Sequence, residues 1–280
     1  MKLYQQTQGT GSPLVLIHGW GMSSAVFLTF AEMLSDSFCV HTLDLPGMGY
    51  SRPCPYTTLD SLSALVGDNM PPQAHWVGWS LGGQVAMQLA LSMPDRVRSL
   101  TLLASTPCFV TAHDWQCAID PSVLADFALG LKEDYRHTIS RFLRLQCLGS
   151  LNARDTMARL QSICTQIPEP DAESLQIALQ ILLHTDLRPV LADIVSPTLV
   201  IHGENDRLVP MAAARFMVQH IPQAQLQVLV GAGHAPFLSH HQQCAEVLRI
   251  FIDGLARSDV CKTVCTGKLG QRTLLGASPI

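Results

Sequence analysis

The sequence predicts an α/β fold in which a mostly parallel central sheet is flanked by helices and interrupted by a helical insertion. Two observations lead to this prediction. Short apolar runs recur along the chain with helix-length segments between them, and one long segment, from about 106 to 185, contains no strand-like run. The chain has 280 residues, of which 48% are hydrophobic, so it is long enough to bury one large α/β core.

Taken in order, the apolar runs predict the strands of the sheet. They lie at 14–17, 38–43, 76–78, 100–104, 198–202 and 226–230. Runs of this length separated by helices are typical of parallel strands joined by crossover helices. Residues 3–7 precede them and predict an antiparallel edge strand, with a turn at 9–13.

The remaining segments define the domain organisation. Between 106 and 185 the sequence favours helices, which the breakers at 149–150 and 168–170 separate. We therefore expect a core of residues 1–105 and 186–257, with a helical lid inserted at 106–185. Residues 258–280 show no sustained periodicity, and we expect a disordered tail there.

Composition and charge exclude several classes of function. The net charge of −4 argues against nucleic-acid binding. No apolar run approaches the length of about 18 residues that a membrane span needs, and the first residues lack the apolar core of a secretory signal. The nine cysteines are scattered without a C-x-x-C pair, which disfavours a metal site. We expect a cytoplasmic monomer without metal.

A serine at a predicted strand-to-helix corner suggests nucleophilic catalysis. Residues 78–82 read Gly-Trp-Ser-Leu-Gly and fit the pattern G-x-S-x-G, in which glycines allow a sharp turn that exposes the serine. A serine hydroxyl is a weak nucleophile and needs a base within hydrogen-bond reach. By itself, a serine between glycines is more often an ordinary turn, so a catalytic Ser80 requires partners elsewhere in the chain.

The first strand run ends in a loop that could hold an oxyanion. Residues 18–21 read His-Gly-Trp-Gly directly after that run. Acyl transfer places negative charge on a carbonyl oxygen, which two fixed backbone N–H groups can stabilise. We expect the backbone N–H groups of Trp20 and Leu81 to serve as these donors. His18 is expected to shape the loop through hydrogen bonds rather than to transfer protons.

Two later turns provide an acid and a base. Asp206 follows the strand run at 198–202, and His234 lies in a glycine-rich loop after the last run. Glu204 is expected to face solvent or cap the turn. The chain has eleven histidines, and His234 is chosen among them because it follows the last predicted strand, where open α/β sheets place their ligands. The order Ser80, Asp206, His234 is the nucleophile, acid and base order of α/β hydrolases, and this chemistry needs no cofactor.

These motifs resemble the α/β-hydrolase superfamily over about residues 10–257. The stretches "HGWGMSSAVF", "LDLPGMGYSR", "GWSLGGQVA", "RFLRLQ" and "GHAPFLSH" further resemble the pimeloyl-[acyl-carrier protein] methyl ester esterases of biotin synthesis. This resemblance implies a serine carboxylesterase that releases methanol and pimeloyl-[acyl-carrier protein]. It also implies a substrate-binding lid segment formed by Phe142, Leu143, Arg144, Leu145 and Gln146. His241 departs from the family pattern, which often has proline there.

The lid carries basic charge that could bind an acidic carrier protein. Between 130 and 160, six basic residues stand against three acidic ones, although the whole chain is acidic. Under the resemblance, Arg141 and Arg154 match arginines of the family, whereas Arg136 and Arg159 are shifted by about one residue. On a helix, Arg141 and Arg144 share a face opposite Phe142 and Gln146. The alternative is a solvated basic face with salt bridges such as Asp155 with Arg159.

Two other functions remain open from the sequence. The first is a general short-chain carboxylesterase or lactonase without carrier specificity, which the substrate profile would distinguish. The second is a catalytically silent binding protein with the same fold, although such proteins usually lack one member of the triad. Dehalogenases and epoxide hydrolases use an aspartate where this chain has Ser80.

Overall fold

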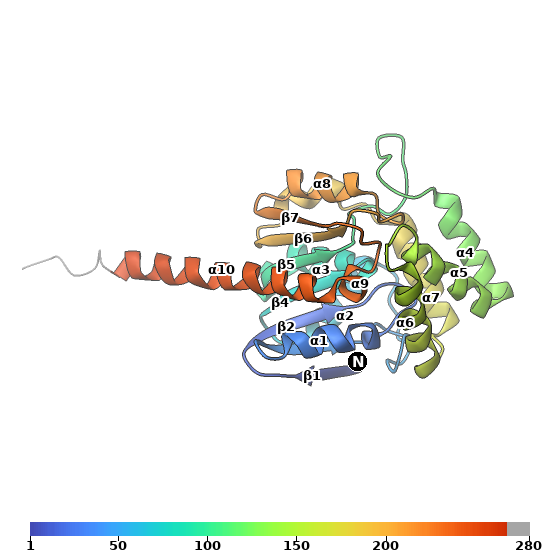
Figure 1. The fold of residues 1–280 in the computed structure, drawn as a ribbon, viewed down its shortest axis with the longest axis horizontal. Coiled ribbons are helices and arrows are strands. Elements are labelled where there is room, and N and C mark those ends of the chain that lie inside the picture. The colour runs from blue at the N-terminus through green and yellow to red at the C-terminus, as the bar shows by residue number, and fades with distance from the viewer. Residues whose placement is uncertain (268–280) are drawn as a thin grey trace, which may run out of the picture.

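The computed structural model describes residues 1–267 and contains a seven-stranded sheet in the order β1-β3-β2-β4-β5-β6-β7 (Figure 1). β1 pairs antiparallel with β3, and the other neighbours pair in parallel. This confirms the predicted α/β class and the antiparallel edge. The strands are β1 Gln5–Gln8, β2 Ser12–Ile17, β3 Phe38–Leu43, β4 Ala74–Trp79, β5 Val97–Leu103, β6 Thr198–Gly203 and β7 Ala224–Leu229.

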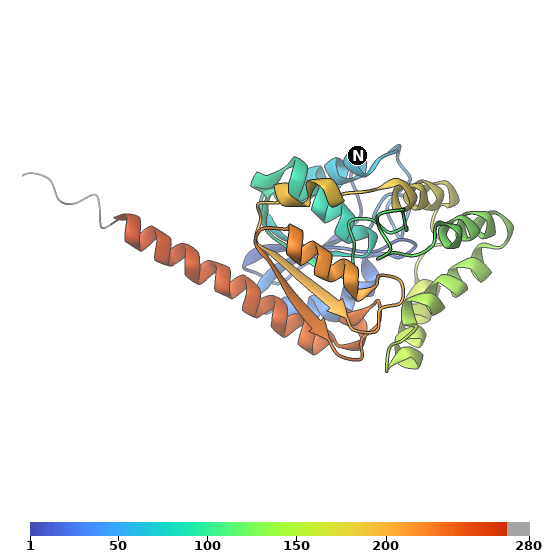
Figure 2. The same ribbon diagram turned by 90° about the horizontal axis from the view of Figure 1, so that it is seen from above.

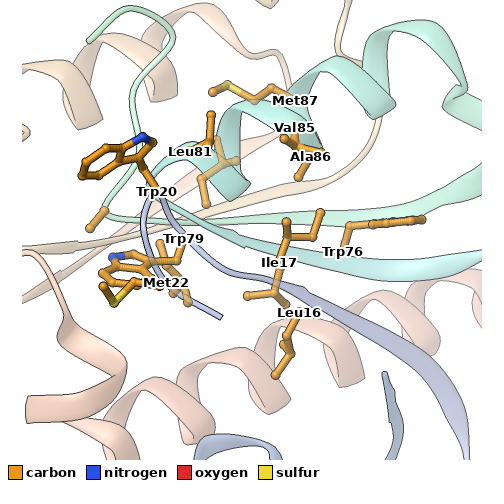
Figure 3. Packing of buried hydrophobic residues seen from close by; sticks show 14 of the residues in the cluster. Leu16, Ile17, Trp20, Met22, Trp76, Trp79, Leu81, Val85, Ala86 and Met87 are labelled. Carbon is orange, nitrogen blue, oxygen red and sulfur yellow. The ribbon is translucent and has the colours of Figure 1, made fainter. Parts of the chain in front are cut away.

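Helices cover the sheet in two packed groups. α1 contacts α10, whereas α2 contacts α3, and α3 also packs on β4 and β5. Side chains from β2, β4 and α3 fill the layer between that helix and the sheet (Figure 3). The helices of the core are η1 Ser24–Phe27, α1 Leu28–Leu34, α2 Leu59–Asn69, α3 Leu81–Ser92, η2 Pro94–Arg96, α8 Met211–His220, α9 Pro236–Ser239 and α10 His241–Gly267.

The insertion forms a helical cap at one end of the sheet (Figure 1). It contains α4 Pro121–Glu133, α5 Tyr135–Cys147, α6 Ala153–Gln166 and α7 Ala172–His184, and η3 Arg188–Asp193 leads back to β6. Asp120, Asp134 and Asp171 each accept a hydrogen bond from a first-turn N–H of α4, α5 or α7, which fixes where these helices begin. The breakers at 149–150 and 168–170 lie between helices, as the sequence predicts.

The C-terminal helix extends further than the sequence suggests. α10 continues to Gly267, ten residues beyond the expected end of the core at 257, and projects away from the body on the side opposite the lid (Figure 2). The rest of the expected tail, 268–280, lies outside the described residues. Within residues 1–267, no helix has the length and apolar character required to cross a membrane.

Close backbone packing at the start of α3 gives a stability prediction. A Cβ added at Gly82 would lie 2.2 Å from the Ile17 carbonyl oxygen, so Gly82→Ala must displace backbone. We expect a loss of about 1–3 kcal/mol in the free energy of unfolding. Gly254 in α10 has no atom within 4 Å of an added Cβ, and Gly254→Ala is expected to stabilise the protein. Chemical denaturation of both variants tests the contrast, and equal effects would contradict it.

Candidate active site

Ser80 lies at the sharp corner between β4 and α3. Its backbone has φ 55° and ψ −119°, a conformation that is uncommon for a residue with a side chain. Two hydrogen bonds fix the corner: the Ser80 N–H donates to the Leu103 carbonyl at 3.0 Å, and Ser105 Oγ donates to the Ser80 carbonyl at 2.7 Å. A Cβ at Gly78 would lie 2.2 Å from the Gly82 carbonyl oxygen, and a Cβ at Gly82 would lie equally close to the Ile17 carbonyl oxygen, which explains both glycines of the motif.

Asp206 and His234 form a buried hydrogen-bonded pair. Nδ1 of His234 donates to Asp206 Oδ2 at 2.8 Å, while Asp206 Oδ1 accepts from the N–H groups of Leu208 and Val209, each at 2.9 Å. Burial alone would raise the pKa of Asp206, but the His234 imidazole and its hydrogen bond bring that pKa below the ordinary value. The carboxylate therefore stays ionised and holds His234 with its proton on Nδ1.

The other ring nitrogen of His234, Nε2, is buried and is left without a hydrogen-bond partner among the described residues. Trp79, the neighbour of Ser80, donates from Nε1 to the His234 carbonyl at 2.8 Å, which ties the histidine loop to the corner. No hydrogen bond joins Ser80 Oγ to His234 in the described part of the chain. Catalytic hydrogen bonds are often long in free enzymes and tighten only when substrate binds.

The loop after β2 borders the serine corner. A Cβ at Gly19 would lie 3.2 Å from Ser80 Cβ, so the Trp20 backbone passes close to the serine. Leu81 is the first residue of α3 and directly follows Ser80. Among the hydrogen bonds within residues 1–267, neither the Trp20 N–H nor the Leu81 N–H has an acceptor. The two backbone N–H groups predicted to stabilise an oxyanion are thus free of internal acceptors in this part of the chain.

His18 has the loop-shaping contacts that its position predicts. Nδ1 donates to the Gly19 carbonyl at 2.8 Å, and Nε2 accepts from the Leu45 N–H at 2.9 Å. Full burial lowers the pKa of His18, which keeps the imidazole neutral. Both ring nitrogens are therefore occupied in holding the loop, and neither is free to transfer a proton.

Only some residues of the predicted lid segment, 142–146 on α5, are buried against the core. Phe142, Leu143 and Gln146 are buried, Leu145 is half-buried and Arg144 is exposed. The Phe142 ring packs edge-on against Trp20, with centroids 4.7 Å apart. Arg144 therefore faces solvent rather than the core, on the outer face that its helical spacing predicts. Two residues along a helix correspond to a rotation of about 200°, so Arg144 lies opposite Phe142, and its Nε donates to the Ser140 carbonyl.

The four lid arginines proposed for docking differ in their contacts. Arg141 is exposed and lies over the Phe127 ring at 5.6 Å, and Arg154 is exposed without an ion pair in the described residues. Arg136 pairs with Glu169 at 2.8 Å. Arg159 donates to the Leu238 carbonyl at 3.2 Å, and its alternative pairing with Asp155 is absent from the ion pairs of residues 1–267.

Three supporting contacts were not anticipated from the sequence. Trp20 Nε1 donates to the Leu175 carbonyl of α7 at 2.9 Å and so joins the β2 loop to the lid. His202 Nε2 donates to the Val209 carbonyl at 2.8 Å and thereby braces the turn that carries Asp206. The Trp79 contact with His234 is the third. A tryptophan or histidine within a buried segment predicts that its ring N–H needs a hydrogen-bond acceptor. The sequence does not identify that acceptor.

Glu204 caps rather than catalyses. Its Oε2 accepts from the Gly231 N–H at 3.1 Å, as the expected capping role requires, and the contact links the Asp206 turn to the His234 loop. Among the described residues, no group of three or more His, Cys, Asp or Glu side chains is arranged to hold a metal.

The chain is similar to known proteins along most of its length. Residues 12–241 match the model of the alpha/beta hydrolase fold family. The chain is 43% identical over 241 residues to the pimeloyl-[acyl-carrier protein] methyl ester esterase of Nitrosomonas europaea, covering 86% of this chain and 96% of that one. It is 42% identical to the protein of the same name from Photobacterium profundum, covering 88% and 97%.

Solved structures agree on the fold. An esterase from Exiguobacterium antarcticum superposes with a TM-score of 0.81 at 20% identity, covering 90% of this chain and 95% of that one. A bromoperoxidase from Bacillus anthracis gives a TM-score of 0.81 at 23% identity with the same coverage. The chain belongs to the alpha/beta hydrolase family and, within it, to the family of the pimeloyl-[acyl-carrier protein] methyl ester esterases.

Proposed function

We propose that this chain is a serine carboxylesterase of biotin biosynthesis that hydrolyses the methyl ester of pimeloyl-[acyl-carrier protein]. The products are pimeloyl-[acyl-carrier protein] and methanol. The observation that carries the proposal is the buried hydrogen bond between Asp206 and His234 beside the strained corner of Ser80. The substrate follows from the names of relatives that are 42–43% identical over nearly their whole length.

Acylation is the first step of the proposed reaction. His234 Nε2 accepts the Ser80 proton as Oγ attacks the ester carbonyl, and Asp206 stabilises the imidazolium that results. The backbone N–H groups of Trp20 and Leu81 stabilise the negative oxygen of the tetrahedral intermediate. His234 then returns the proton to the departing oxygen, methanol leaves, and the acyl group remains on Ser80.

Deacylation repeats the same transfers with water. His234 takes a proton from water, the hydroxide attacks the acyl carbonyl, and the proton returns to Ser80 Oγ. The free acid is released and the serine is restored. Every proton moves between named side chains and water, so the proposed reaction uses no cofactor.

The lid contacts support an apolar acyl chain as the bound group. Phe142 from α5 is buried and packs edge-on against Trp20 of the β2 loop, which passes close to the serine corner. Methylene groups gain free energy when apolar side chains remove them from water. Such a lining therefore favours an ester on an aliphatic chain, with the charged carrier outside.

The carrier is proposed to dock on the outer face of the lid. Acyl-carrier proteins are acidic, so a basic surface would attract them. Arg141 and Arg154 are exposed and unpaired by acids in the described residues, whereas Glu169 already compensates the charge of Arg136. Arg159 is partly engaged by the Leu238 carbonyl. We therefore assign docking chiefly to Arg141 and Arg154.

Ser80→Ala tests the nucleophile. We expect turnover to fall by several orders of magnitude, leaving roughly 10³- to 10⁴-fold acceleration over water from the remaining site. A fluorophosphonate should label the unmodified protein at Ser80 and leave the variant unlabelled in mass spectrometry. Ser92→Ala, at the exposed far end of α3, is the matched control and should keep full turnover. Near-normal turnover of Ser80→Ala would refute the assignment.

Asp206→Asn tests the orienting acid. The amide cannot hold the imidazole with its proton on Nδ1 as the carboxylate does, and we expect kcat to fall about 10³- to 10⁴-fold. Glu204→Gln, in the same turn, is the control because its amide oxygen can still accept from Gly231. Steady-state kinetics on a simple ester measures both. If the two variants lost activity equally, Asp206 would have no special role.

Charge reversal tests carrier docking. Arg141→Glu combined with Arg154→Glu should lower kcat/KM on methyl pimeloyl-[acyl-carrier protein] and weaken its dependence on salt, because salt screens exposed charges. Hydrolysis of a simple methyl ester should not change. Arg98→Glu, an exposed reversal at the start of β5, is the matched control. An equal loss on both substrates would refute docking at these arginines.

Comparison of the two substrates also separates the general esterase alternative. A carrier-specific enzyme should hydrolyse the carrier-bound ester far faster than the same acyl chain on a small thioester, with a strong salt dependence. Equal kcat/KM values would leave an esterase without carrier specificity.

A further inference from the structure

We propose that the turn between α5 and α6, residues 146–151, positions the catalytic histidine, and that Gly149 is a positioning residue of this enzyme. The inference rests on the proposed function, because it concerns the efficiency of the same site. It assigns the lid a second role besides covering the acyl chain. The evidence is a set of backbone contacts between this turn and the loops that carry His234 and Asp206.

The turn is hydrogen-bonded to the histidine loop at two points. The His234 N–H donates to the Gln146 carbonyl at 3.2 Å, at the C-terminal end of α5. The Leu151 N–H donates to the Gly231 carbonyl at 2.9 Å. These contacts bracket residues 231–234 from the lid side, and both use main-chain atoms, so they do not depend on the identity of the lid side chains.

Gly149 brings the turn against the loop that carries the acid. Its φ of +82° is in the left-handed region, which residues with a Cβ rarely adopt. An added Cβ would lie 2.3 Å from the carbonyl oxygen of Asn205, the residue before Asp206. Because this neighbour is backbone, relief of the clash would require the turn or the Asp206 loop to move.

The histidine loop needs support from outside its own sequence. His234 is preceded by two glycines, Gly231 and Gly233, which leave the main chain with wide conformational freedom. From the core side, Trp79 holds the His234 carbonyl. From the lid side, Gln146 holds its N–H. The peptide groups on both sides of the His234 Cα are therefore anchored, one by each part of the molecule.

Anchoring of this kind matters for rate more than for binding. A displacement of about 1 Å at a reacting group can reduce catalysis about 10²-fold even when substrate still binds. Phe142, which packs against Trp20, lies one turn earlier on α5, and its side chain takes no part in the hydrogen bonds to His234. A disturbed turn should therefore lower kcat while leaving KM nearly unchanged.

Gly149→Ala is the primary test, assayed on a short-chain nitrophenyl ester so that carrier docking plays no part. We expect kcat to fall roughly 10- to 100-fold, with KM changed less than about twofold. Gly130→Ala is the matched control. Its Cβ would lie 2.5 Å from Thr138 Oγ1, and only side-chain atoms of Thr138 lie near it, so the clash can be relieved inside the lid without moving the α5 backbone that supports His234. This control should keep its kcat.

A second pair of variants, at Leu151, tests the loss of one hydrogen bond to the histidine loop. The Leu151 side chain is 80% exposed, so Leu151→Ala should behave like the unmodified protein. Leu151→Pro removes the N–H that donates to Gly231. Leu151 is the second residue of the turn closed by the hydrogen bond from the Ala153 N–H to the Ser150 carbonyl, a position that favours proline. We expect kcat to fall in Leu151→Pro and to stay unchanged in Leu151→Ala. This pair decides the matter if Gly149→Ala does not fold.

Ser80→Ala measured in parallel separates this inference from the proposed function. If Ser80→Ala is inactive while Gly149→Ala and Leu151→Pro keep kcat, the positioning role is refuted and the esterase assignment stands. An equal fall of kcat in Gly130→Ala, or a change confined to KM or melting temperature, also refutes positioning. Full activity of Ser80→Ala would overturn the proposed function and this inference with it.

Discussion

The close approach of backbone at the corner between β4 and α3 is the constraint on which the rest of the site depends. Carbonyl oxygens of β2 and α3 occupy the space that a Cβ would need at Gly82 and Gly78, so the helix begins against the strands. Ser80 is left in a conformation that a side chain rarely adopts. The same packing places the Leu81 N–H at the first turn of α3, where the helix dipole favours negative charge. One steric arrangement thus fixes the proposed nucleophile at a sharp corner and places a backbone N–H directly after it.

Two tryptophan N–H groups connect this corner to segments far along the chain, the His234 loop and helix α7 of the lid. Trp79 reaches the His234 carbonyl and Trp20 reaches the Leu175 carbonyl in α7, 155 residues away in each case. A buried indole N–H without an acceptor would be costly, so these bonds favour one arrangement of lid and histidine loop over alternatives. The indole rings of Trp20 and Trp79 also pack against Phe142 and Phe237, so each tryptophan holds its neighbours by a hydrogen bond and by ring packing.

The sequence predicts the sheet and the order of Ser80, Asp206 and His234 because these depend on local patterns: apolar runs, glycines at a corner, and polar residues after strands. The outward orientation of Arg144 is predicted in the same way, since helical periodicity places it opposite Phe142. Contacts between distant segments were not predictable. Nothing near Arg136 indicates Glu169 as its partner, and nothing near Gly149 indicates Asn205, because these pairs meet only after the lid folds back on the core.

Helix α5 shows how one element can meet three requirements at once. Its outward face carries Arg141, its inward face carries Phe142, and its last turn presents the Gln146 carbonyl to His234. A helix of 13 residues is rigid over its length, so its two faces and its end keep a fixed relation to one another. Movement of α5 would therefore change the acyl pocket and the support of the histidine together. The lid of this protein is better regarded as the second half of the active site than as a cover placed over a finished one.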